Sequence, residues 1–161
     1  MDFLNELFDV YKKTNRIKFK EPTETSNQPI SFGDIIEIYT ANQMLVAVVI
    51  SNDNEAILMS EFVEFATNTD FIVSINHAIA KKWIIETDKK LYLNSGVKYR
   101  IVTKLGYKDS EILRKILKGN PVPAEKSGPK TPPNPKDPRY KFKLEELKKT
   151  MLVNKHLFFE D

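Results

Sequence analysis

The feature that most constrains this chain is the clustering of its prolines near one end. Seven of the nine prolines fall between Pro121 and Pro138. Proline fixes φ at about −65° and has no backbone N–H, so such a segment forms neither a helix interior nor a central strand. The sequence therefore predicts an extended arm, close to polyproline II, that follows a folded body. The expected parts are residues 1–29, an N-terminal helix and linker; residues 30–120, a β body with a closing helix; and residues 121–161, the arm and a docking segment.

The composition predicts one compact, soluble body without covalent cross-links. Hydrophobic residues make up 41% of the 161 residues and charged residues 29%, as in globular domains. There is no cysteine, which excludes disulfides and thiolate chemistry. No apolar run approaches the roughly 18 residues of a membrane span, and the N-terminus shows no leader pattern. We therefore expect no membrane association, no cofactor and no metal, and a location in the cytoplasm or in a virus particle assembled there.

Short apolar runs separated by turn residues fill the middle of the chain. Residues 44–50 are an unbroken apolar run, short enough to be a central strand buried on both faces. Several such runs, with turns every eight to twelve residues or so, favour a small barrel over an α/β sheet. The predicted fold class is therefore mainly β. Strands are expected at residues 35–39, 44–50, 56–59, 61–65, 71–75, 82–86, 90–93 and 98–103.

Three segments carry the pattern of helices. Residues 2–14 and 143–153 each place large apolar side chains at helical spacing. Residues 109–118 begin at a capping Asp109 or Ser110 and carry basic residues in the last turn, which complements the helix dipole. The sequence thus predicts an N-terminal helix, a helix that follows the β body, and a short helix at the end of the arm.

Acidic and basic residues occupy different halves of the body. No Lys or Arg lies between Lys20 and Lys81, whereas eleven lie from Lys81 to Lys118. Aromatic residues interleave with these cations, as on surfaces that bind nucleic acid. The alternative is that Trp83 packs in the core and that the lysines are solvated positions of strands. The candidate nucleic-acid contacts within residues 81–118 are Lys81, Lys82, Lys89, Lys90, Lys98 and Arg100.

The chain offers few groups for acid–base catalysis. His77 and His156 are the only histidines. His77 has no acidic residue within six positions, so we expect it in a loop or at a rim, and we expect His156 to be a contact of the arm. Asp53, Asn54 and Glu55 lack the spacing of a calcium loop and are expected to form a hairpin turn. No catalytic residue and no metal ligand is assigned.

Three short motifs in the β body follow one another in the order found in a known family. Residues 32–36 read Phe-Gly-Asp-Ile-Ile, residues 47–53 read Ala-Val-Val-Ile-Ser-Asn-Asp, and residues 104–113 read Lys-Leu-Gly-Tyr-Lys-Asp-Ser-Glu-Ile-Leu. They resemble the opening strand, the Ala-Leu-Val-Val-Ser-Asn-Asp run and the closing segment of the PemK/MazF-type growth-inhibitor toxins. The resemblance covers about residues 32–118 and implies an SH3-like barrel.

The catalytic pattern of that family does not carry over. The family places Arg-Pro directly before the Ala-Leu-Val-Val strand, where the Arg stabilises charge during RNA cleavage, but Leu45 and Val46 stand at those positions here. A site that cleaves RNA also needs cations near the phosphate, and this half of the body has none. The resemblance therefore implies the barrel and argues against the ribonuclease activity.

The arm favours a role in assembly. An extended segment tipped with apolar side chains is suited to docking on another protein or on a second copy of the chain, as in multi-subunit particles such as virion shells. The leading hypothesis is a non-catalytic structural or adaptor subunit. A toxin-like RNA-acting protein and a nucleic-acid-binding regulator stay open as alternatives. The expected partner-binding residues are Leu144, Leu147, Met151, Phe158 and Phe159.

Overall fold

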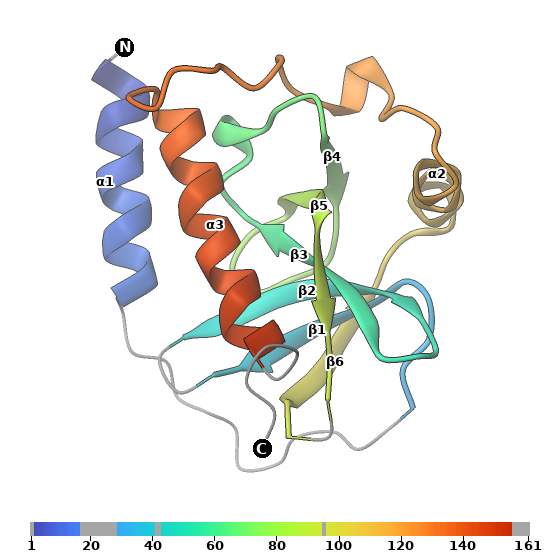
Figure 1. Ribbon diagram of the computed structural model, residues 1–161. Helices are drawn as coiled ribbons and strands as arrows, with labels where there is room; N and C mark the ends of the chain where they lie inside the picture. Colours follow the sequence, from blue (N-terminus) through green and yellow to red (C-terminus); the bar gives the residue numbers. More distant parts are fainter. Residues whose placement is uncertain (1, 17–28, 41–42, 95, 156–161) are drawn as a thin grey trace.

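The computed structural model describes residues 2–16, 29–40, 43–94 and 96–155 of the chain (Figure 1). Its centre is an antiparallel sheet of six strands in the order β4-β5-β3-β2-β1-β6. The strands of the described part are β1 Asp34–Tyr39, β2 Met44–Ser51, β3 Glu55–Ser60, β4 Asp70–Ser74, β5 Lys82–Tyr92 and β6 Lys98–Lys104; the α-helices are α1 Asp2–Arg16, α2 Tyr107–Leu117 and α3 Pro138–Asn154; the 3-10 turns are η1 Val63–Phe65 and η2 Ala124–Lys126.

The mainly β fold predicted from the sequence is confirmed, but the sheet is not closed. β4 and β6 are its two edges, and neither pairs with the other. Register shifts interrupt the β1–β6, β2–β3 and β3–β5 pairings. Such bulges bend a strand and increase its twist. The sheet therefore curves enough to hold buried side chains against both of its faces without forming a continuous hydrogen-bonded barrel.

Strand β2 is the central strand that the apolar run predicts. Val46 and Val48 point into one core cluster, which Leu113 of α2 also enters. Ala47 and Val49 point to the other side and join a second cluster. All four valine and alanine side chains are buried, which confirms the expectation of a strand covered on both faces. An uninterrupted apolar run is what such a position requires.

Helices α1 and α3 lie side by side against one part of the sheet (Figure 1). Tyr11 of α1, Phe65 of η1 and Phe142 of α3 form the centre of a third buried cluster. The ring of Phe142 lies 4.8 Å from those of Tyr11 and Phe65, measured between centroids. Aromatic packing thus fixes α3 against α1. None of the helices in the described part of the chain has the length and apolar character needed to cross a bilayer.

One predicted strand was wrong, and two others are parts of a single strand. Residues 61–65 end in the 3-10 turn η1 instead, because the Ser60 hydroxyl accepts the Phe62 N–H at 3.2 Å and stops β3. Residues 82–86 and 90–93, predicted as two strands, belong to the single strand β5, apart from Leu93. Between these two segments, the Thr87 hydroxyl donates to the Thr69 carbonyl at 2.5 Å.

The helix boundaries also differ from the predicted ones. α2 begins at Tyr107 with Gly106 as its N-cap, and no side chain caps it, so the predicted cap by Asp109 or Ser110 was wrong. α3 begins five residues earlier than predicted, at Pro138, where the Asp137 carboxylate accepts the Arg139 N–H at 2.9 Å. Proline suits the first position of a helix because its missing N–H has no intrahelical partner there.

The proline-rich segment crosses its own body rather than leaving it. It runs from α2 over β4 to α3 (Figure 1), and Gly128 donates its N–H to the Thr67 carbonyl at 3.0 Å. A Cβ at Gly128 would lie 2.1 Å from the Ala66 carbonyl oxygen, so only glycine permits this approach. Lys126 pairs with Asp109 at 3.1 Å. Helix α3, which follows this segment, packs on the body of its own chain, and the docking of another chain on its outer face stays a prediction.

Candidate docking surface on helices α1 and α3

Helix α3 buries a face of mixed polarity against the body and leaves four large apolar side chains exposed to solvent. Beneath it, Glu146 and Thr150 are buried together with Phe142 and Val153. An ordinary surface helix turns its apolar stripe to the core and its charged residues to solvent. Helix α3 instead divides its large apolar side chains between the two faces, and its buried face includes a glutamate. The outer face of α3 consists of Lys141, Leu144, Leu147, Lys148, Met151, Leu152 and Lys155, all of which are exposed.

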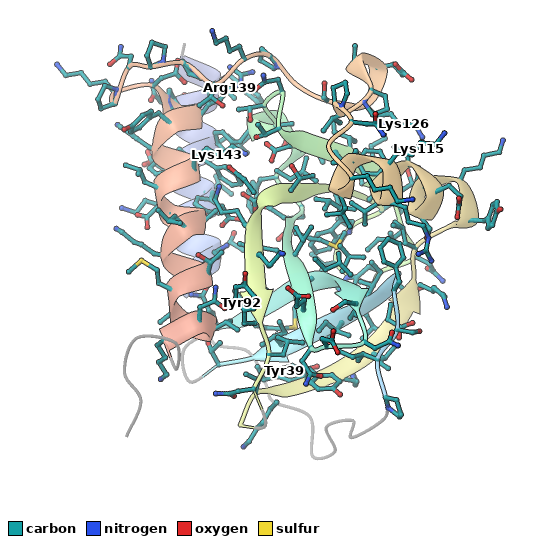
Figure 2. The ribbon with its side chains drawn as sticks, turned by 45° about the vertical axis from the view of Figure 1, so that its right-hand side comes forward. Tyr39, Tyr92, Lys115, Lys126, Arg139 and Lys143 are labelled. Atoms are coloured by element: carbon teal, nitrogen blue, oxygen red, sulfur yellow. The ribbon has the colours of Figure 1, made fainter. Side chains whose placement is uncertain are left out.

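A cluster of charged side chains holds the buried face of α3 in place. The Glu146 carboxylate accepts hydrogen bonds from the Tyr11 hydroxyl and from the Lys149 ammonium, each at 2.5 Å. Lys143, which lies on the sheet side of α3 (Figure 2), pairs with the buried Asp70 of β4. Fixed hydrogen-bonded ion pairs of this kind compensate the cost of burying charge. The α3 ion cluster consists of Tyr11, Asp70, Glu86, Lys143, Glu146 and Lys149.

Glu86 and Glu146 form the centre of this cluster and carry opposite pKa shifts. Burial, followed by the charge of Glu146, raises the pKa of Glu86 well above its ordinary value. Burial also acts to raise the pKa of Glu146, but Lys149 and hydrogen bonds from Glu86 and Tyr11 outweigh it and lower that pKa. No described residue donates to either oxygen of Glu86. The pKa of Glu86 therefore lies above that of Glu146, so Glu86 takes up a proton before Glu146 does as the pH falls.

The outer face of α3 and one flank of α1 enclose a groove of about 480 Å³. Phe8 forms part of its floor, and the ammonium groups of Lys12 and Lys141 lie 5.8 and 6.0 Å from the centre of that ring. Glu145 pairs with Lys12 at 3.8 Å and with Lys148 at 3.3 Å. Three lysines against one glutamate leave the rim positive. The groove is lined by Phe8, Lys12, Lys141, Leu144, Glu145, Leu147, Lys148 and Met151.

The structure brings together three of the five residues expected to bind a partner. Leu144, Leu147 and Met151 line the groove and are 46%, 47% and 58% exposed. Their role in docking stays a prediction. Phe158 and Phe159 lie outside the described residues, as does His156.

The residues expected to contact nucleic acid lie on or directly before β5 and on β6. Three strands separate β5 from β6, which carries Arg100. Lys89 is buried and pairs with Asp88 at 3.0 Å, so it is not an exposed cation. Trp83 is 3% exposed and packs in the core, as the alternative interpretation expected. The remaining residues of the set, Lys81, Lys82, Lys90, Lys98 and Arg100, are exposed.

A buried carboxylate that the sequence analysis did not single out organises a second polar site. Glu37 of β1 accepts the Tyr39 hydroxyl at 2.5 Å and the Arg100 Nη2 at 2.7 Å on one oxygen, and its other oxygen lies 3.0 Å from His77 Nε2. Burial acts to raise the pKa of Glu37, but hydrogen bonds from Tyr39, Arg100 and His77 outweigh it, so the pKa lies below its ordinary value. Burial, followed by the hydrogen bond to Glu37, raises the pKa of Tyr39.

Sequence reasoning missed this site because its members are far apart along the chain. His77 lies in the loop before β5, as expected, but its side chain is only 2% exposed. Its acidic partner, Glu37, is 40 positions upstream, which is too distant for a local sequence pattern to reveal. The available signal was a charged Glu37 within the otherwise apolar strand Ile-Ile-Glu-Ile-Tyr, since a buried charge needs a partner.

The oxygen-rich segment at residues 53–55 belongs to the turn between β2 and β3. Asn54 has a φ of 63°, a left-handed conformation that asparagine tolerates in turns. The hairpin expected there is confirmed. Within the described residues, no group of three acidic or histidine side chains is arranged to hold a metal ion.

Comparison with known proteins adds no relative to this description. No protein-family model, no curated protein and no solved structure matches the chain. The likeness to the growth-inhibitor toxins therefore rests on the three sequence motifs alone, and functional inference rests on the surfaces described above.

Proposed function

We propose that this chain is a non-catalytic adaptor subunit that docks a partner protein on the groove between α1 and α3. The observation that carries the proposal is the stripe of large apolar side chains exposed on the outer face of α3. Leu144, Leu147 and Met151 stay in water while the buried face of the same helix carries a glutamate. Exposed apolar stripes rimmed by polar residues are typical of interaction sites. A partner that covers this stripe would remove its apolar side chains from water.

The partner that fits best is an amphipathic helix with acidic residues beside its apolar stripe. A groove between two helices accepts a third helix through anchors at i, i+3 and i+7. The outer face of α3 exposes Lys141, Lys148 and Lys155, and the one glutamate that lines the groove, Glu145, already pairs with Lys12 and Lys148. Acidic flanks on the partner would complement these charges, whereas a second copy of this chain would oppose lysine to lysine.

The alternative of a toxin-like RNA-acting protein finds less support. Leu45 and Val46, at the positions where those toxins carry Arg-Pro, are buried within β2. An SH3-like arrangement of the β body stays a proposal about the fold and carries no activity with it. The alternative of a nucleic-acid-binding regulator also finds less support, because Lys89, one of its candidate cations, is buried and pairs with Asp88.

A direct test uses two fluorescent helical peptides of about 20 residues with leucines at i, i+3 and i+7. One peptide carries glutamates beside the leucines and the other carries lysines. The full chain should bind the acidic peptide and not the basic one. Leu147→Glu should weaken that binding by about tenfold or more, because it places a charge in the apolar floor. Tyr107→Gln, at an 80% exposed aromatic on α2, is the matched control and should change nothing.

Equal binding of both peptides, or of neither, would contradict the proposed partner. Light scattering provides the other decisive result. A dimer of the chain that Leu147→Glu dissociates would identify a second copy as the occupant.

A further inference from the structure

A second pocket lies away from the groove, over β1 and β6 and beside the loop between β4 and β5. Its volume is about 360 Å³. We propose that this pocket binds a carboxylate, with Arg100 as the binding residue and Glu37 as the positioning residue. The inference does not depend on the docking function. The remaining lining residues are Asn76, His77, Ala78, Ile101 and Val102.

The guanidinium of Arg100 is fixed from its inner side. Arg100 and Glu37 face each other across the β1–β6 pairing, and Nη2 donates to the buried carboxylate at 2.7 Å. The Tyr39 hydroxyl also bonds to the guanidinium. Arginine carries five N–H donors in a planar fork, and these two partners do not use them all. The Arg100 side chain is 48% exposed, so its outer donors face the pocket already oriented.

The polar network behind Arg100 is equipped to hold a ligand and not to move protons. His77 Nδ1 accepts the Ile79 N–H at 3.0 Å, which assigns the ring proton to Nε2, where it is donated to Glu37. Both ring nitrogens are therefore occupied, and a general base needs a free lone pair. The Glu37 carboxylate is likewise used by Tyr39, Arg100 and His77. The chemistry left at the surface is recognition by donors.

A carboxylate fits these donors better than other anions do. The outer edge of Arg100 matches the two oxygens of a carboxylate, and the exposed Asn76 lies beside it with an amide that can donate a further bond. Ala78, Ile101 and Val102 give the pocket an apolar wall for the body of the ligand. Glu37 offsets the charge of Arg100, so the pocket has little net charge, which suits a monoanion better than a polyanion.

The test is a titration of the isotope-labelled full chain followed by the backbone resonances of Asn76, Ala78 and Val102. The probes are isobutyrate, N-acetyl-alanyl-alanine with a free carboxylate, the amide of that dipeptide, and inorganic phosphate. We expect saturable shifts with the two carboxylates, with dissociation constants on the order of millimolar. Arg100→Lys, which keeps the charge beside Glu37 but loses the fork, should weaken binding by about tenfold. Arg114→Gln is the control, because that guanidinium stacks on Phe32 at 3.9 Å on another part of the surface.

The outcomes separate the sources of the ligand. Isobutyrate binding as tightly as the dipeptide would assign the site to small organic acids, and tighter dipeptide binding would assign it to peptide ends. Either result supports the carboxylate site. The proposal is overturned if no probe gives a saturable shift in the wild-type chain. It is also overturned if the amide or phosphate binds as well as the carboxylates, or if Arg100→Lys and Asn76→Ala both leave the binding unchanged.

Discussion

The interior of the sheet and the interface beneath α3 are both buried, yet different forces hold them. The sheet interior consists of two clusters of aliphatic and aromatic side chains, with Val48 and Ile57 fully enclosed in one of them. The α3 interface adds a cluster of three acids and two lysines to its aromatic contacts. Apolar burial has no pH dependence, whereas buried carboxylates depend on their protons and partners. The difference indicates that α3 is attached to the body by contacts that pH and single charges can weaken.

Removal of one charge from the α3 ion cluster should have the largest effect. Lys143→Met keeps the side-chain length but leaves the buried Asp70 without its cation. The loss of one partner from a buried pair costs about 3 to 5 kcal/mol of stability. Urea unfolding measures it. Lys148→Met, at a lysine whose side chain is 71% exposed, is the matched control and should cost less than about 1 kcal/mol. Equal costs for the two variants would remove the contrast between buried and exposed ion pairs.

Truncation in the sheet interior should have the next largest effect. Val48 is fully buried in the central strand β2, so Val48→Ala removes two methyl groups from a packed core. We expect a loss of about 1 to 3 kcal/mol in the free energy of unfolding. The loss should be the same at pH 5 and pH 8, because no titrating group is changed. A loss that varies strongly with pH would contradict the distinction between the two regions.

The raised pKa of Glu86 should make the free energy of unfolding depend on pH. The folded pKa of Glu86 is raised above the ordinary value of 4.5, so its contribution is full below pH 4.5 and is lost as the pH rises through the folded pKa. While Glu86 stays protonated only in the folded state, stability falls by about 1.4 kcal/mol per pH unit from this group. Glu86→Gln keeps a donor to Glu146 without titrating. Unfolding curves from pH 5 upward should therefore fall less steeply for the variant, and parallel curves would show that Glu86 is ionised in the fold.

The sequence predicts the first region far better than the second. The run at residues 44–50 predicts a central strand because every side chain in it is apolar and favours burial. The α3 ion cluster joins Tyr11 to Glu146 and Asp70 to Lys143, pairs separated by 135 and 73 positions, and local patterns carry no information about such contacts. Local patterns do not predict the contact between His77 and Glu37 for the same reason, since 40 positions separate them.

The apolar spacing at residues 143–153 correctly predicts a helix in α3. It does not predict which face of that helix is buried. The spacing of Leu144, Leu147 and Met151 predicts a helix, and their role as docking residues stays a prediction. Only the structure shows that the body is covered by the opposite face, and that the arm is held against its own body at Gly128. The close approach of Gly128 to Ala66 joins two segments that are distant in the chain. Local sequence patterns therefore predict an extended arm and not its contact with the body.

We propose that the outer face of α3 can bind a partner because its apolar side chains contribute little to the stability of the chain itself. The most direct measurement is the free energy of unfolding of a triple variant, Leu144→Gln, Leu147→Gln and Met151→Gln, which keeps helix propensity and side-chain length. We expect the free energy of unfolding to change by less than about 1 kcal/mol in total, because exposed side chains contribute little to stability. A loss of several kcal/mol would show that these side chains hold α3 to its own body, and the docking surface would then not exist.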